Sequence, residues 1–186
     1  MTGVGIKDAL IRPPGATNLV TNGGFETDIT GWVKAGTNTI AVSVEQAMFG
    51  TQSLKATYQD STTLAQFAIT LTSAGYTASC FIYIPTAWDG GAPRLERVGF
   101  TGATGSVNVS ASLAIRDAWQ RVVLSGFIPD AGDLTGAIQI NAAAGVPTAG
   151  RFIYIDGAQT ELGLIATPYI HTDGATASRA GMKWVA

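Results

Sequence analysis

One stretch decides the fold of this chain, residues 151–172, which read RFIYIDGAQTELGLIATPYIHT. Its first half is rich in β-branched and aromatic residues and has no proline, and its first glycine follows Asp156, which is typical of a β-strand. Pro168 excludes a continuing helix and restricts Thr167 to extended backbone. We therefore expect a buried strand that reaches an acidic residue, continues, and leaves as an extended tail.

Similar strand signals recur along most of the chain, separated by Gly, Pro, Asp and Asn. Strands are expected at 19–20, 39–45, 53–58, 64–71, 76–84, 94–100, 107–113, 119–128, 136–141 and 151–162. Helical periodicity is not sustained anywhere. Short strands at this spacing predict an all-β fold, an antiparallel β-sandwich or barrel, and argue against alternating strands and helices.

The chain divides into three parts. Pro13, Pro14 and Gly15 end an N-terminal arm at residues 1–16. The sandwich is expected at 17–162, and a C-terminal tail at 163–186. A length of 186 residues suits one domain with such appendages.

Composition excludes several classes of partner. Charged residues make up 13% of the chain and the net charge is −2, so there is no basic stripe to bind nucleic acid. The hydrophobic share is 46%, which argues against disorder and suggests that other subunits cover some apolar surface. We therefore expect a homo-oligomer.

Targeting signals are not evident in the sequence. No apolar run has the length of a signal peptide or a membrane span, so we expect synthesis in the cytoplasm and no membrane insertion. Cys80 is the only cysteine, which excludes a disulfide within the chain. It lies on the apolar-facing side of its strand, where a small buried hydrophobe is expected.

Catalysis has little support in the sequence. His171 is the only histidine and lies in the expected tail, and no motif of a nucleophile and its base surrounds it. Acidic residues are numerous enough for a carboxylate pair, but their number is ordinary for a chain of this length. We therefore predict a protein that is not an enzyme.

A metal site is a better-founded hypothesis. Glu26 lies after a glycine-rich turn, and Asp156 follows an apolar strand. If the first and last strands are neighbours, the two carboxylates meet and can serve as calcium ligands together with carbonyl oxygens of the turn. The alternative is that both cap turns and accept backbone hydrogen bonds.

Sugar binding requires exposed aromatic rings. Trp88 lies in the loop PTAWDGG (85–91), where a large ring has little to pack against, and Phe81 and Tyr83 lie on the more polar face of the preceding strand. These three residues are the predicted carbohydrate-binding site. The alternative for Trp88 is packing under its own loop or into a neighbouring subunit. Trp119 is interpreted as a core residue.

Several short motifs, in order, resemble the jelly-roll carbohydrate-binding modules found beside xylanases and glucanases. They are NLVTNGGFE (18–26) with Gly31-Trp32, GTQSLK (50–55), WQRV (119–122) and FIYID (152–156). The resemblance implies a jelly-roll β-sandwich in which Glu26 and Asp156 help to hold a structural calcium. It assigns no sugar-stacking residue.

The C-terminal stretch resembles a segment of tailed-phage virion proteins. It is DGAQTELGLIATPYIHT (156–172), followed by Gly174 to Arg179; it departs from the pattern at Thr160 and Leu162, and at His171 where proline is usual. This resemblance implies a tail or capsid decoration protein, located in the virion, that contacts other virion proteins and host surface glycans. The alternative function is a stand-alone carbohydrate-binding module.

Overall fold

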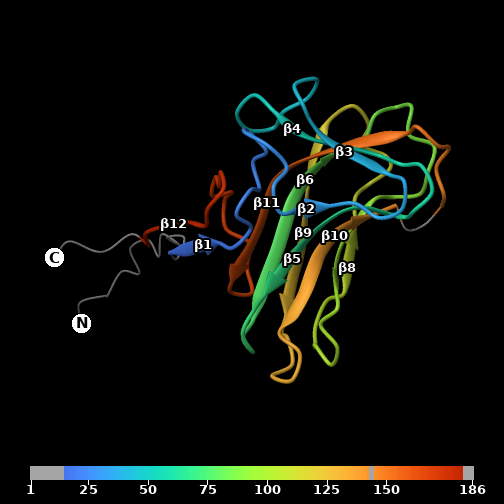
Figure 1. The fold of residues 1–186 in the computed structure, drawn as a ribbon. Coiled ribbons are helices and arrows are strands. Elements are labelled where there is room, and N and C mark those ends of the chain that lie inside the picture. The colour runs from blue at the N-terminus through green and yellow to red at the C-terminus, as the bar shows by residue number, and fades with distance from the viewer. Residues whose placement is uncertain (1–14, 143–144, 182–186) are drawn as a thin grey trace, which may run out of the picture.

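The computed structural model of the chain describes residues 15–142 and 145–181, and in these ranges it is an antiparallel β-sandwich (Figure 1). The predicted all-β class is confirmed. The strands are β1 (Ala16–Asn18), β2 (Trp32–Val33), β3 (Thr39–Ser43), β4 (Ser53–Thr57), β5 (Thr63–Thr70), β6 (Tyr76–Tyr83), β7 (Arg94–Val98), β8 (Asn108–Ser110), β9 (Trp119–Phe127), β10 (Thr135–Asn141), β11 (Phe152–Leu162) and β12 (Ala177–Arg179). In the ranges described, no helix is long and apolar enough to cross a membrane.

Two five-stranded sheets form the two layers. Sheet I has the order β2-β5-β10-β7-β8, and sheet II has the order β3-β4-β11-β6-β9. A small ribbon of β1 and β12 lies beside the sandwich at one end (Figure 1). A strand was expected at residues 19–20, and the structure has β1 directly before them, at Ala16–Asn18. The short strands β2 and β12 carry too little alternation to be recognised in the sequence.

The alternation predicted for residues 76–84 is present. Its apolar set, which includes Cys80 and Ile82, is almost fully buried between the sheets, and Phe81 and Tyr83 lie on the outward face of sheet II. Burial raises the pKa of the Cys80 thiol, so this residue is an unreactive part of the core. Each Leu or Ile buried in this layer contributes about 1.5–3 kcal/mol.

A β-bulge in β11 shapes the end of sheet II near β1. The pairing of β11 with β6 shifts between Asp156 and Gln159, which removes Ala158 from the ladder. The Ala158 N–H instead donates to the Gly23 carbonyl at 2.9 Å, and the Ala158 carbonyl accepts from Asn18 Nδ2 at 3.0 Å. A Cβ on Gly23 would lie 2.0 Å from that carbonyl oxygen, which explains the glycine.

Asn18 connects three segments from its fully buried position. Its Nδ2 also donates to the Ile170 carbonyl at 3.0 Å, and its Oδ1 accepts from the N–H groups of Val20 at 3.0 Å and Thr160 at 3.2 Å. One side chain therefore joins the first strand, the last long strand and the segment after it. The motif at 18–26 and the motif at 156–172 meet at this residue.

Residues 163–172, expected as part of a tail, are packed along the outward face of sheet II, and we call them the strap. Glu161 accepts from the Thr167 N–H and hydroxyl, both at 2.7 Å, and Gln159 Oε1 accepts from the Ile170 N–H at 2.7 Å. Arg121 donates to the Thr167 carbonyl at 2.5 Å. Gln159 and Glu161 are each 1% exposed, because the strap covers them.

The other appendages are described only in part. The expected arm at 1–16 lies mostly outside the described residues, as does the end of the tail at 182–186. Near the end of the described part of the tail, β12 pairs with β1 through Ala177 to Arg179.

The Asn18 contacts give the first prediction. Asn18→Ala leaves the Ile170 and Ala158 carbonyls and two N–H groups without their partner, and each such buried group costs about 1–3 kcal/mol. We expect a loss of about 3 kcal/mol or more in the free energy of unfolding, measured by urea denaturation. The matched control is Thr17→Ala, whose hydroxyl bonds only to Ser178 at an exposed position. Equal stability of the two variants would contradict the connecting role of Asn18.

Candidate functional site

Four aromatic side chains form a row on the outward face of sheet II, and we call Trp119, Tyr83, Tyr154 and Phe152 the aromatic row. Tyr83 on β6 pairs with Trp119 on β9 and with Tyr154 on β11. Its ring centroid is 5.6 Å from that of Trp119 and 5.7 Å from that of Tyr154. Phe152 lies two positions before Tyr154 on β11 and therefore on the same face, with the ring centroids 5.5 Å apart.

The rings of the row differ in how far they reach solvent. Tyr154 is 3% exposed, whereas Trp119, Tyr83 and Phe152 are partly exposed. The rings meet edge to face, with interplanar angles of 64° to 78°. Such contacts favour aromatic pairs by about 0.5–1.5 kcal/mol each, so the row is a rigid surface with three accessible rings.

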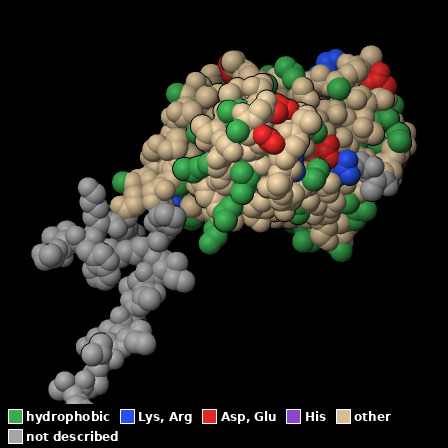
Figure 2. Space-filling model, turned by 90° about the horizontal axis from the view of Figure 1, so that it is seen from below, with side chains coloured by type: hydrophobic (Ala, Val, Ile, Leu, Met, Phe, Trp, Pro, Cys, Tyr) green, Lys and Arg blue, Asp and Glu red, His purple; other side chains and the backbone are tan. Residues whose placement is uncertain are grey.

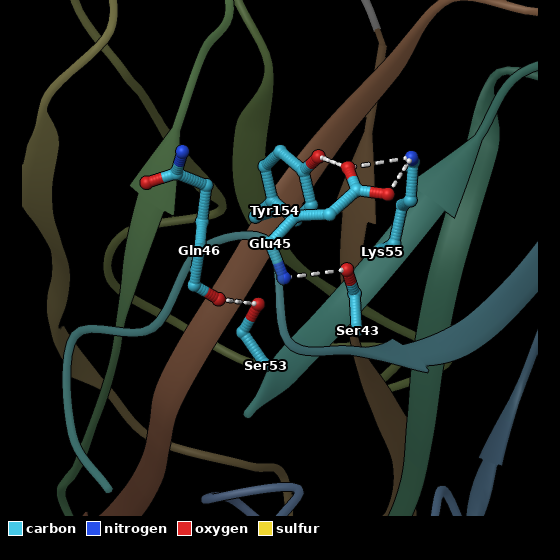
Figure 3. A network of polar contacts seen from close by, with 6 residues as sticks. All are labelled: Ser43, Glu45, Gln46, Ser53, Lys55 and Tyr154. Carbon is cyan, nitrogen blue, oxygen red and sulfur yellow. Dashed lines mark hydrogen bonds and ion pairs between the residues drawn. The ribbon is translucent and has the colours of Figure 1, made fainter. Parts of the chain in front are cut away.

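A polar network lies beside Tyr154 and Phe152 at one end of the row, and Figure 3 shows its contacts around Glu45. The Glu45 carboxylate accepts from the Tyr154 hydroxyl and from Lys55 Nζ, the latter at 2.9 Å. The Glu45 N–H donates to Ser43 Oγ at 3.2 Å, which fixes the turn after β3. These contacts hold an acidic and a basic group at the edge of the aromatic surface.

Burial and the Glu45 carboxylate set the protonation state of Tyr154. Burial and the hydrogen bond to Glu45 raise the pKa of Tyr154, and the same hydrogen bond together with Lys55 lowers the pKa of Glu45. At neutral pH the phenol is therefore a donor and the carboxylate an acceptor. Lys55 Nζ lies 4.0 Å from the centre of the Phe152 ring, a cation–π contact that holds the ammonium beside the row.

Phe81, the second predicted residue on this face, lies next to the row. Its ring is partly exposed, contacts Phe49 at 5.2 Å between centroids and lies 5.8 Å from the Arg121 guanidinium. Phe49 also packs on Tyr169 of the strap at 4.7 Å. Phe81 therefore lies between the open aromatic row and the part of the face that the strap covers.

The third predicted residue, Trp88, is placed differently from the expectation of an exposed ring. It is 2% exposed and belongs to the hydrophobic core, and its indole Nε1 donates to the Gly91 carbonyl at 2.9 Å. Packing under its own loop, the alternative role, is the arrangement found. The loop turns inward because the ring buries a large apolar area, so Trp88 offers no face to a sugar.

Three members of the row, Trp119, Tyr154 and Phe152, are not among the residues predicted from the sequence. Trp119 was interpreted as core, but it is absent from the core cluster and pairs with the outward residue Tyr83. The same alternation that assigned Tyr83 outward also places Phe152 and Tyr154 on the face opposite to Ile153 and Ile155. That signal was present within the strand at 151–162, but the register between strands was needed to join it to Tyr83.

The outward face of sheet I carries a second cluster, made of polar residues and therefore called the polar cluster. Glu96, Gln139 and Asn141 are 6%, 6% and 7% exposed, although they point away from the core. Glu96 accepts from the amides of Gln139 and Asn141 and lies 2.5 Å from Arg94 Nε. Asn141 Oδ1 is buried without a hydrogen-bond partner among the residues that the structure describes.

The predicted metal ligands Glu26 and Asp156 bind the same loop, residues 46–52. Asp156 Oδ2 accepts from the N–H groups of Met48 at 2.8 Å and Phe49 at 2.9 Å. Glu26 accepts from the N–H groups of Thr51 and Gln52, with distances of 3.0–3.1 Å. This is the arrangement of the alternative role, in which both carboxylates cap a turn.

Electrostatics distinguish the two carboxyl groups. Burial raises the pKa of Asp156 to about 6, against the effect of its backbone hydrogen bonds, and the charge of Glu26 adds to the rise. Burial also raises the pKa of Glu26, but the hydrogen bonds from Thr51 and Gln52 outweigh it and the net shift is downward. The pKa values of the two carboxyl groups therefore shift in opposite directions.

A calcium ion does not fit this arrangement as it stands. Ca²⁺ takes six to eight oxygen ligands, whereas these carboxylate oxygens already accept backbone N–H groups. No group of three or more His, Cys, Asp or Glu in the described ranges is placed to hold a metal. Calcium binding stays a prediction that requires the 46–52 loop to rearrange.

Thermal unfolding with excess calcium and with excess chelator tests the calcium prediction. A site at Glu26 and Asp156 predicts a higher melting temperature with calcium, by several degrees, because a ligand that binds only the folded state stabilises it. Glu26→Gln should abolish the difference. Equal melting temperatures of the unaltered chain in both conditions contradict a calcium site and leave the two residues as turn caps.

Comparisons with known proteins show the class of fold. No protein-family model matches the chain, and no curated protein matches it significantly. Among solved structures, the chain is similar to the C-terminal family 22 carbohydrate-binding module of Clostridium thermocellum Xyn10B. The TM-score is 0.57 and the identity 13%, over 77% of this chain and 93% of that one.

Two further solved structures have a similar fold. The xylan-binding domain of family 22, formerly called x6b, matches with a TM-score of 0.56 and 15% identity over 78% of this chain and 94% of its own. TmCBM61, solved with β-1,4-galactotriose, matches with a TM-score of 0.56 and 17% identity over 78% of this chain and 99% of its own. The chain therefore has the β-sandwich fold of carbohydrate-binding modules.

Proposed function

We propose that this domain binds carbohydrate, without catalysis, through the aromatic row. The observation that carries the proposal is the contiguous set of partly exposed rings, Trp119, Tyr83 and Phe152, on one outward sheet face. The likeness in fold to xylan-binding and galactotriose-binding modules supports the same function, although a fold alone does not fix a function.

The chemistry of the surface suits a sugar. Apolar C–H faces of a pyranose pack on aromatic rings, and sugar hydroxyls need donors and acceptors at the ring edges. Glu45 supplies an acceptor and Lys55 a donor at one end of the row. Phe81 borders the surface on the side of the strap, so the predicted residues Tyr83 and Phe81 belong to the proposal and Trp88 does not.

We also propose, as a finer and separate point, that the domain is displayed on a phage particle, where its glycans would be those of the host surface. Support comes only from the resemblance of residues 156–179 to virion proteins. The solved structures named above are carbohydrate-binding modules and add nothing to a virion location, so they favour a stand-alone carbohydrate-binding module more directly. Mass spectrometry of purified particles from a producing strain tests the location: absence of the chain from the particle contradicts it.

A glycan array followed by calorimetry tests carbohydrate binding. For a glycan that binds, Trp119→Ala and Tyr83→Ala should each weaken binding by at least about tenfold, because truncation of a central aromatic hot spot costs about 2 kcal/mol or more and about 1.4 kcal/mol is tenfold. The matched control is Gln139→Ala in the polar cluster on the other sheet, which should leave the affinity unchanged.

The outcomes separate the function from its location. Absence of binding across a broad array contradicts carbohydrate binding. Binding that survives Trp119→Ala and Tyr83→Ala but is lost in Gln139→Ala retains the function and moves the site to the polar cluster of sheet I. Circular dichroism of each variant verifies that the sandwich is intact.

A further inference from the structure

Four loops lie near one another at the lower end of the sandwich in Figure 1. The Gly163 N–H donates to the Gly75 carbonyl at 2.8 Å, and Ser73 Oγ donates to the Pro129 carbonyl at 3.2 Å. Thr104 forms an isolated bridge with Ile128. The loops at 71–75, 99–107, 128–134 and 162–166 are therefore joined to one another.

This end exposes a group of large apolar side chains. Leu162, Leu164 and Ile165 are 64%, 58% and 81% exposed, and we call these three the apolar tip. Figure 2 views the molecule from this side, where charged side chains are few. Single exposed apolar residues are ordinary, but three within four positions mark an interaction surface.

A hollow adjoins the apolar tip. It has a volume of about 250 Å³ and lies between the β1–β12 ribbon and the end of β11, with Leu19, Leu162 and Arg179 among its lining residues. Leu162 therefore belongs both to the tip and to the hollow. The two features form one acceptor surface.

The ends of the described chain lie at the same place. Gly15, which lines the hollow, approaches Gly181 so closely that a Cβ on Gly15 would lie 2.8 Å from the Gly181 nitrogen. Residues 1–14 precede this point and read MTGVGIKDALIRPP, with Val4, Ile6, Leu10 and Ile11 as apolar members. A segment that carries four large apolar side chains, together with Lys7, Asp8 and Arg12, is thus attached beside an apolar acceptor surface.

We propose that the apolar tip and the hollow of one copy receive residues 1–14 of a second copy of this chain. A stable interface buries about 800 Å² per partner, more than three side chains supply, so an apolar segment has to complete it. Two consecutive prolines, Pro13 and Pro14, separate the apolar residues of the segment from Gly15, a sequence that disfavours a tight reversal onto the same copy's tip. This interface does not depend on carbohydrate binding.

Light scattering of the purified full chain is the first test. We expect a mass at least twice that of one chain, and a fall to the mass of one chain on deletion of residues 1–14 and, separately, in Leu164→Glu/Ile165→Glu. Val146→Glu is the matched control, because Val146 is 69% exposed on the loop between β10 and β11 and lies outside the acceptor surface. It should keep the mass of the unaltered chain.

Mixing the two defective variants tests whether the contact crosses between copies. The deletion variant retains the acceptor surface, and Leu164→Glu/Ile165→Glu retains the segment. The proposal predicts that the mixture regains a complex containing both chains, detected by a tag on one of them, although each variant alone is a monomer.

Several results would overturn the proposal. They are a full chain that is monomeric across the concentration range, an unchanged mass in either variant, an equal loss of mass in Val146→Glu, and a mixture that stays monomeric. Circular dichroism and melting temperature of every variant show that the sandwich is folded. Glycan affinity, measured on the same samples, reports the proposed function separately.

Discussion

The buried amide of Asn18 is the contact on which the rest of the structure depends. The bulge in β11 takes the Ala158 N–H and carbonyl out of the ladder, and an unpaired buried backbone group is costly. Asn18 and Gly23 supply the missing partners, and Asn18 also binds Ile170 in the strap. Sheet II keeps its bulge because the segment before the sandwich and the segment after it close around that point.

This closure divides the outward face of sheet II into two halves with different chemistry. Near the bulge the face is polar, and its side chains form hydrogen bonds with the strap. They are Gln159, Glu161 and Arg121. Beyond Asp156 the face is aromatic and open to solvent. The contact of Tyr169 with Phe49, and of Phe49 with Phe81, marks the boundary. The strap therefore limits the surface that a ligand can reach to the aromatic half.

Much of the fold was predictable from the sequence, and the candidate site was predictable only in part. Alternation in 76–84 correctly placed Cys80 inward and Tyr83 outward, because side chains on a strand alternate between faces. Trp88 could not be placed from sequence, since whether a loop folds over its own indole depends on space left by distant strands. The partner of Tyr83 on β9 was missed although the alternation of its own strand indicates its face: Trp119 lies three positions before the inward Val122 and so on the opposite face. Its place beside Tyr83 depends on the register between two strands remote in sequence, which the core as a whole sets.

The closeness of Gly15 and Gly181 has a consequence for how such a domain combines with other proteins. A domain whose first and last residues lie next to each other can be inserted into a surface loop of another protein without separating the two ends of that loop. Because the row from Trp119 to Phe152 lies on the sheet and not at these ends, an inserted copy would keep its aromatic face uncovered. The fold is therefore suited to insertion into unrelated proteins, in each of which its aromatic face would stay exposed to solvent.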